Sequence, residues 1–130
     1  MLNNALILVA EDQVFIALEL AMAVEDAGGV VAGPAASVKT ALELIDAMPI
    51  VAGILDFNLT DGDVTPVAAA LLERNIPFII QTGIGLPPEI TARFPDLVVR
   101  MKPNHSEDLI RDLNELIAAN CEGTRQLVAD

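Results

Sequence analysis

The chain has 130 residues, a length that fits one domain and leaves no room for a second. Its 19 acidic and 7 basic side chains give a net charge of −12, which argues against direct binding to the phosphate backbone of a nucleic acid. At 53% hydrophobic residues the chain is too apolar to be disordered, and we expect it to fold alone.

Five short apolar runs recur along the chain and predict the strands of a sheet. They cover residues 5–10, 30–32, 50–55, 78–80 and 97–99. Their starts lie 19 to 28 residues apart, an interval that holds one strand, one helix and two turns. Runs without polar alternation are typical of strands buried on both faces. The predicted fold class is therefore α/β, a five-stranded parallel, doubly wound sheet with five helices.

The first three helices are predicted from their end signals and apolar spacing. The first spans about 13–27 and stops at Gly28, which suits a left-handed C-terminal cap. The second is capped by Ser37 and closed by Pro49. The third is indicated by three apolar residues, Val67, Leu71 and Leu72.

The last two helices differ in how clearly they are marked. Prolines at both ends of the segment 86–95 predict a fourth helix that is short or irregular, in the region we expect to be most mobile. Acidic residues follow Ser106, and an apolar stripe continues toward residue 120. We therefore predict a domain over residues 1–120 and a C-terminal tail over 121–130.

The expected location is the cytoplasm. A lone cysteine, Cys121, cannot form an internal disulfide, and no charged-then-apolar leader opens the sequence. The longest strongly apolar stretches, such as 5–10, are well short of the roughly 20 residues that a membrane helix needs. No membrane partner is expected.

Polar side chains follow four of the five apolar runs. They are Glu11, Asp12, Asp56, Thr82 and Lys102. Taken singly, each has an ordinary explanation as a helix start, a loop or a surface residue. Because the carboxyl ends of parallel strands form the ligand-binding edge of such a sheet, the set as a whole indicates one site.

Three converging carboxylates repel one another unless a cation neutralises them. Oxygen ligands without clustered histidine or cysteine favour a hard ion, and a site with few protein ligands favours Mg²⁺. Asp56, between the acid pair and the lysine, is then the candidate nucleophile for a phosphoryl group. Lys102 and Thr82 are candidates for contacting the phosphoryl oxygens.

This pattern resembles the CheY-like receiver domains of two-component response regulators, here of the stand-alone kind, over residues 6 to about 120. The resemblance implies a flavodoxin-like sheet with strand order 2-1-3-4-5. It also implies that Asp56 accepts a phosphoryl group from a histidine kinase or histidine phosphotransfer protein and that the signal passes to a downstream protein. Thr82 would move toward the phosphoryl group, Lys102 would pair with it, and the bond before Pro103 would be cis.

The resemblance further implies how the metal is held and what turnover to expect. Asp12, Asp56 and the main-chain carbonyl of Asn58 would bind Mg²⁺, with Glu11 acting through water. No conventional turnover enzyme is expected, only Mg²⁺-dependent phosphorylation of Asp56 followed by slow loss of the phosphoryl group.

The sequence departs from the usual receiver pattern at the positions that communicate activation. Val99 stands where receivers usually have an aromatic residue. The segment 77–85 is similar to the FATGUY subgroup of stand-alone receivers, but Gln81 occupies the alanine place and Gly85 the tyrosine place.

Two other functions remain as alternatives. The first is an adaptor that binds its partner without phosphorylation, or a sink for phosphoryl groups. The second is a phosphatase of the haloacid dehalogenase type, because residues 54–60 resemble its apolar strand followed by Asp-x-Asp-x-Thr. Asn58 replaces the second acid of that motif, which counts against it.

Overall fold

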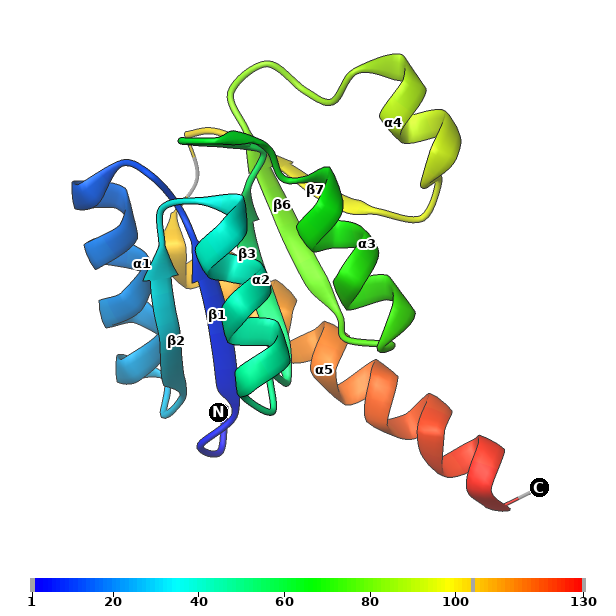
Figure 1. Cartoon of the computed structure of the whole chain (residues 1–130). Helices are drawn as coiled ribbons and strands as arrows, with labels where there is room; N and C mark the ends of the chain where they lie inside the picture. Colours follow the sequence, from blue (N-terminus) through cyan, green and yellow to red (C-terminus); the bar gives the residue numbers. More distant parts are fainter. Residues whose placement is uncertain (1, 104, 130) are drawn as a thin grey trace.

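The computed structural model describes residues 2–103 and 105–120, together with the backbone of 121–129. Within this part a parallel sheet lies between two layers of helices (Figure 1). Its strands are β2 (Val30–Ala35), β1 (Leu6–Ala10), β3 (Ala52–Asp56), β6 (Phe78–Thr82) and β7 (Val98–Met101), in that spatial order. Since β6 and β7 are the fourth and fifth strands of this sheet, the predicted order 2-1-3-4-5 and the fold class are confirmed.

A small hairpin follows β3, where the sequence indicated an ordinary loop. Its strands β4 (Asn58–Leu59) and β5 (Gly62–Asp63) pair antiparallel, with Leu59 opposite Gly62. Gly62 has φ +143°, a conformation open to glycine and strained for other residues. The segment that leaves the carboxyl end of β3 is thus a defined turn.

The five predicted helices are present. They are α1 (Val14–Asp26), α2 (Val38–Ala47), α3 (Thr65–Glu73), α4 (Pro88–Arg93) and α5 (Ser106–Ala129). Gly28 follows α1 with φ +88°, and the Ser37 hydroxyl accepts the Thr40 N–H at 3.1 Å to cap α2, both as predicted. In α3, Val67 and Leu71 are buried, whereas Leu72 is 43% exposed because it lies about 100° around the helix from Leu71.

The central strands β1, β3 and β6 are buried on both faces, which explains their unbroken apolar runs. Ile7 and Val9 of β1 pack with α1 and α5 on one face, while Leu8 and Ala10 pack with α2 and α3 on the other. Figure 1 shows these helix pairs on opposite sides of the sheet. Fully burying an aliphatic side chain contributes about 1.5–3 kcal/mol, so both layers hold the central strands in place.

Helix α4 is packed far less tightly than the others. It has six residues, as the flanking prolines predicted, and none of them is buried. Ile90 packs only partly against the core cluster on the α2–α3 side. In Figure 1 a long loop joins α4 to β6 at the carboxyl edge of the sheet.

Two further expectations from the sequence concern a C-terminal tail and the absence of a membrane helix. The division between a domain over 1–120 and a tail over 121–130 stays a prediction, because the side chains beyond residue 120 lie outside the described residues. Among the described residues, no helix has the length and apolar character needed to cross a membrane.

Candidate functional site

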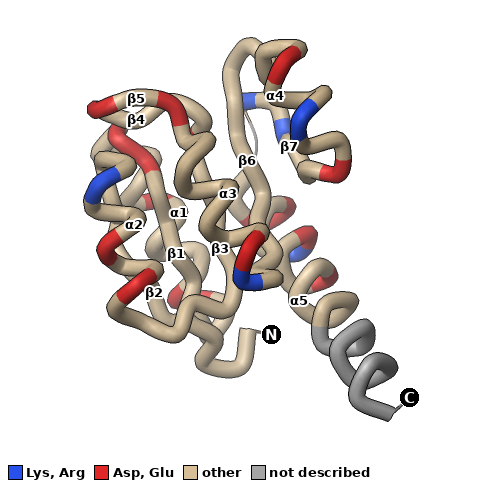
Figure 2. Tube along the Cα trace, turned by 45° about the vertical axis from the view of Figure 1, so that its right-hand side comes forward, with Lys and Arg blue, Asp and Glu red and all other residues tan. Residues whose placement is uncertain are grey.

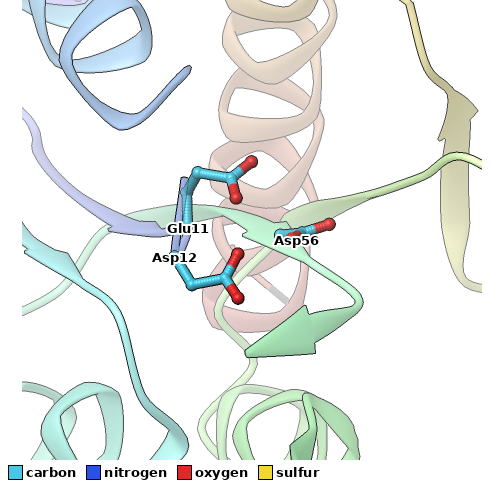
Figure 3. Close-up of side chains that lie close together, drawn as sticks. All are labelled: Glu11, Asp12 and Asp56. Atoms are coloured by element: carbon cyan, nitrogen blue, oxygen red, sulfur yellow. The ribbon is translucent and has the colours of Figure 1, made fainter. Parts of the chain in front are cut away.

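The three predicted carboxylates meet at the carboxyl edge of the sheet. Glu11 and Asp12 follow β1, and Asp56 is the last residue of β3. One oxygen from each lies within 4.8 Å of the others. Figure 3 shows the three side chains gathered on the same side of the strand ends. The neighbouring, parallel β1 and β3 explain the convergence, because their carboxyl ends lie side by side.

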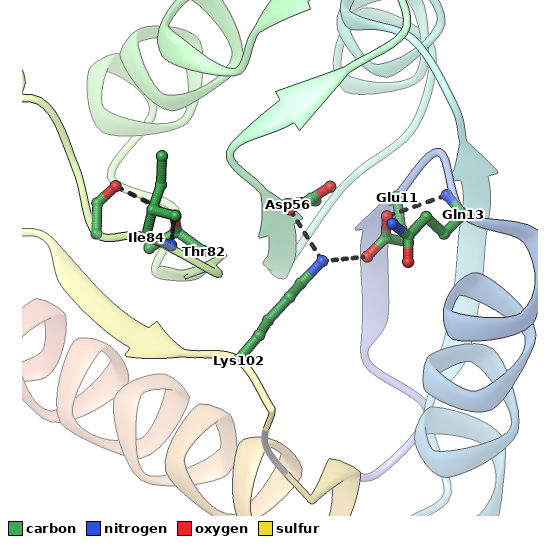
Figure 4. Close-up of polar contacts among 7 residues, drawn as sticks. Glu11, Gln13, Asp56, Thr82, Ile84 and Lys102 are labelled. Carbon is green, nitrogen blue, oxygen red and sulfur yellow. Dashed lines mark hydrogen bonds and ion pairs between the residues drawn. The ribbon is translucent and has the colours of Figure 1, made fainter.

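Lys102 reaches into this cluster from the end of β7. Its Nζ lies 3.0 Å from Glu11 Oε1 and 3.1 Å from Asp56 Oδ1 (Figure 4). The Glu11 side chain has no exposed surface, whereas those of Asp56 and Lys102 are 12% and 20% exposed. Burial by itself lowers the pKa of Lys102, but its hydrogen bonds and charge pairs with Glu11 and Asp56 outweigh burial and raise that pKa above its usual value.

The charge of the cluster suits a divalent cation. Three carboxylates and one ammonium give the cluster a formal charge of −2. Like charges held this close repel, and the all-oxygen donor set is the kind that hard cations prefer. Glu11, Asp12 and Asp56 therefore fit a metal ion.

Backbone hydrogen bonds hold the acidic residues in place. The Glu11 N–H donates to the Ala35 carbonyl at 2.9 Å, and its Oε2 accepts the Gln13 N–H at 3.1 Å. After Asp56, the Phe57 N–H donates to the Gln81 carbonyl at 3.0 Å, which ties the end of β3 to β6. These contacts fix the backbone that carries Glu11 and Asp56.

Thr82, at the end of β6, is buried but faces the loop that leads to α4. Its hydroxyl donates to the Gly85 carbonyl at 3.1 Å and accepts the Ile84 N–H at 3.3 Å (Figure 4). Gly85 has φ +83°, which favours glycine at this turn. The Thr82 hydroxyl is thus hydrogen-bonded to the loop in this structure. Its contact with a phosphoryl group stays a prediction.

The remaining sequence-derived features of the site are in the expected places. Asn58 opens β4, two residues after Asp56, and the role of its main-chain carbonyl stays a prediction. The Lys102–Pro103 bond is cis, as the resemblance implied. Val99 lies in β7 and is partly buried.

Asp61, which no sequence pattern singled out, makes contacts that link the turn after β3 to α2. Its carboxylate accepts the N–H groups of Val38 at 2.6 Å and Lys39 at 3.1 Å, at the start of α2. The hydrogen bond from Val38 is the main reason that the pKa of Asp61 is lowered, and the bond from Lys39 acts in the same direction. The two amides lie 23 and 22 positions away in the chain, so no local pattern could have revealed the contact.

Acidic residues are not confined to the cluster. Figure 2 shows them on the β4–β5 hairpin and on the helices, with far fewer basic residues among them. The net charge of −12 is therefore spread over the surface, and the cluster of Glu11, Asp12 and Asp56 is distinguished by its convergence and burial.

The known proteins that this chain resembles are solved structures. The sequence matches no protein-family model and no curated protein. Among solved structures, it is similar to a response regulator receiver protein from Sinorhizobium medicae, at 25% identity and a TM-score of 0.78 over 92% of this chain and 99% of that one. It is also similar to SdrG from Sphingomonas melonis, at 33% identity and a TM-score of 0.73 over 91% and 99%. A CheY-like receiver domain protein from Methanospirillum hungatei shares the fold, at 21% identity and a TM-score of 0.81 over 92% and 98%.

Proposed function

This chain belongs to the CheY-like receiver domains of response regulators, and from that premise we propose that it takes up a phosphoryl group on Asp56 with the help of Mg²⁺. The observation that carries the proposal is that the Asp56 carboxylate, 12% exposed, lies beside both the ammonium of Lys102 and two further acids. A partly exposed carboxylate can be reached by a phosphodonor, and the adjacent ammonium stabilises the negative charge that the phosphoryl group adds.

The proposed step is a transfer between two nucleophiles. A carboxylate oxygen of Asp56 forms a bond to phosphorus while the bond from phosphorus to a histidine nitrogen of the donor breaks, and that imidazole is released. Mg²⁺, held by Asp12, Asp56 and the main-chain carbonyl of Asn58 with Glu11 acting through water, would neutralise charge on the phosphoryl oxygens. The Lys102 ammonium lies 3.1 Å from Asp56 Oδ1 and would pair with a phosphoryl oxygen on that residue.

Thr82 connects this step to the loop before α4. A hydroxyl has one proton to donate, and in this structure it donates to the Gly85 carbonyl. Donation to a phosphoryl oxygen on Asp56 therefore requires that the Thr82–Gly85 hydrogen bond break. We propose that phosphorylation frees the β6–α4 loop in this way, and that the downstream protein recognises the rearranged surface.

The exposed side of α1 supports docking of the phosphodonor beside the site. Val14, Phe15, Leu18 and Met22 are 68%, 86%, 52% and 63% exposed and follow one another along the helix. Large apolar side chains grouped on a surface mark interaction sites. This row begins two residues after Asp12, so a protein that covers it would lie beside the carboxylates. We propose that this partner is a histidine kinase or histidine phosphotransfer protein, which presents its phosphohistidine there.

The proposal is tested by intact-mass measurement after incubation with acetyl phosphate, with and without Mg²⁺. We expect the mass of one phosphoryl group to be added only when Mg²⁺ is present. Asp56→Asn should abolish the gain, whereas Asp26→Asn, the same change at an exposed position at the end of α1, should leave it unchanged. Equal uptake by the wild type and Asp56→Asn would overturn the assignment of Asp56.

The same samples separate the alternatives. Absence of phosphoryl uptake together with unchanged partner binding would favour an adaptor that acts without phosphorylation. Continuous release of phosphate from phosphate monoesters would favour a phosphatase, since a receiver takes up one phosphoryl group and loses it slowly.

A further inference from the structure

The turn that follows β3 is tied to the start of α2 by four hydrogen bonds. The Thr60 N–H and hydroxyl both donate to the Ala36 carbonyl, each at 3.1 Å. The Asp61 carboxylate accepts the Val38 N–H at 2.6 Å and the Lys39 N–H at 3.1 Å. Two consecutive residues of this turn thus anchor it to a different βα unit.

These bonds do more than cap a helix, because α2 already has a cap of its own. The Ser37 hydroxyl accepts the Thr40 N–H. Asp61 takes the first two amides of the helix, where a negative charge is favoured by the helix dipole. The start of α2 therefore serves as a fixed support against which the turn is held.

The anchored turn carries the main-chain carbonyl of Asn58. On its β3 side, the segment is held by the Phe57 N–H bond to the Gln81 carbonyl. On its α3 side, the Val64 N–H donates to the Phe57 carbonyl at 2.8 Å. Between these two hydrogen bonds, Asn58 is exposed. At the tip of the turn, Thr60 and Asp61 form hydrogen bonds with the start of α2 and with the segment that precedes it.

We infer that Asp61 is a positioning residue for the metal site: by anchoring the turn to the start of α2, it holds the Asn58 carbonyl at the edge where Glu11, Asp12 and Asp56 converge. The inference rests on the proposed function, since the Asn58 carbonyl matters only if it is a ligand of Mg²⁺. Groups that orient metal ligands without touching the metal typically change metal affinity by about 10- to 100-fold when removed.

Ser37 provides a matched control for this inference. Asp61→Ala removes the cap and the anchor together, whereas Ser37→Ala removes only a cap of the same helix. Each change removes an N-terminal cap of α2 and should lower the free energy of unfolding by a similar amount. A purely structural role for Asp61 therefore predicts the same Mg²⁺ affinity in both variants.

The experiment measures the Mg²⁺ dissociation constant of the full chain by calorimetric titration, alongside urea unfolding without Mg²⁺. We expect Asp61→Ala to weaken Mg²⁺ binding about tenfold and Ser37→Ala less than twofold. Asp61→Asn keeps a side-chain oxygen that can accept an amide and should recover part of the affinity. If Asp61→Ala does not fold, Thr60→Val, which removes only the hydroxyl bond to Ala36, should weaken binding about two- to threefold.

The possible failures are distinguishable. A wild-type chain that binds no Mg²⁺ would overturn the proposed function and this inference with it. Measurable wild-type binding, with equal constants for Asp61→Ala and Ser37→Ala, would overturn the inference alone. In the same way, a Thr60→Val constant equal to that of the wild type would count against the anchor.

Discussion

The carboxyl edge of the sheet has a tightly packed half and a loosely packed half. In the first half, all five residues of β3 are buried and the acidic residues are fixed by backbone contacts. In the second half, none of the four residues of β7 and none of the six of α4 is buried, and Ile84 in the loop between β6 and α4 is 90% exposed. The proposed nucleophile Asp56 thus ends a fully buried strand, whereas Lys102 follows the loosely packed β7. Thr82 ends the buried strand β6, at the point where the chain enters the exposed loop to α4.

The largest expected effect tests the packing difference itself. Ile54→Ala in β3 should lower the free energy of unfolding by about 2–5 kcal/mol, because it leaves a cavity in a fully buried strand. Ile90→Ala in α4 should cost less than about 1 kcal/mol, because this side chain is only partly buried. Urea unfolding measures both changes in the free energy of unfolding. If the two variants lose equal amounts, the two halves do not differ in packing.

The second prediction concerns Lys102, the residue that joins the halves. Its pKa is raised in the folded protein, so its contribution to stability is complete below the ordinary value of 10.5 and is lost only as pH rises through the higher folded-state pKa. At pH 7, Lys102→Met should therefore lower the free energy of unfolding in Mg²⁺-free solution by about 1–3 kcal/mol, since it leaves three carboxylates without their cation.

Added Mg²⁺ sharpens this test. It should raise the melting temperature of Lys102→Met by more than that of the wild type, because a divalent ion replaces the missing positive charge. Thermal unfolding with and without Mg²⁺ measures the two shifts. A smaller shift in the variant would argue against Mg²⁺ at these carboxylates.

A smaller effect is expected in the loosely packed half. Thr82→Val keeps the shape of the side chain but removes the hydroxyl bonds to Gly85 and Ile84. The Ile84 amide should exchange its proton about fivefold faster, which corresponds to roughly 1 kcal/mol for one hydrogen bond. Exchange at Ile54 serves as the control and should not change. Faster exchange at both amides would mean that the halves are coupled more tightly than their packing indicates.

The smallest effect concerns the anchor of the turn at Asp61. Its folded-state pKa is lowered, so its contribution to stability is present above the ordinary value of 3.8 and is lost as pH falls through the lower folded-state pKa. Stability of the wild type should therefore decline more steeply than that of Asp61→Asn as pH falls below 3.8. Urea unfolding over a range of pH measures both stabilities. If the stabilities of the wild type and Asp61→Asn fall in parallel, the Asp61 carboxylate contributes nothing to stability at this exposed turn.

Much of the fold could be predicted because its signals are local. Apolar runs such as 50–55 indicated strands buried on both faces, and Gly28 and Ser37 marked helix ends. The β4–β5 hairpin was missed, because its two-residue strands carry too few side chains to show a pattern. The candidate site followed from one rule of topology, namely that parallel strands deliver their final residues to one edge.

The sequence by itself determined the fold class and the convergence of Glu11, Asp12, Asp56 and Lys102, because burial and strand direction are encoded in short segments. Only the tertiary structure decided which contacts are made by these four residues and by the residues around them. Thr82 faces Gly85, and Asp61 holds the amides of α2 from more than 20 positions away in the chain. Such contacts depend on how separate βα units pack, and no local pattern of residues specifies that packing.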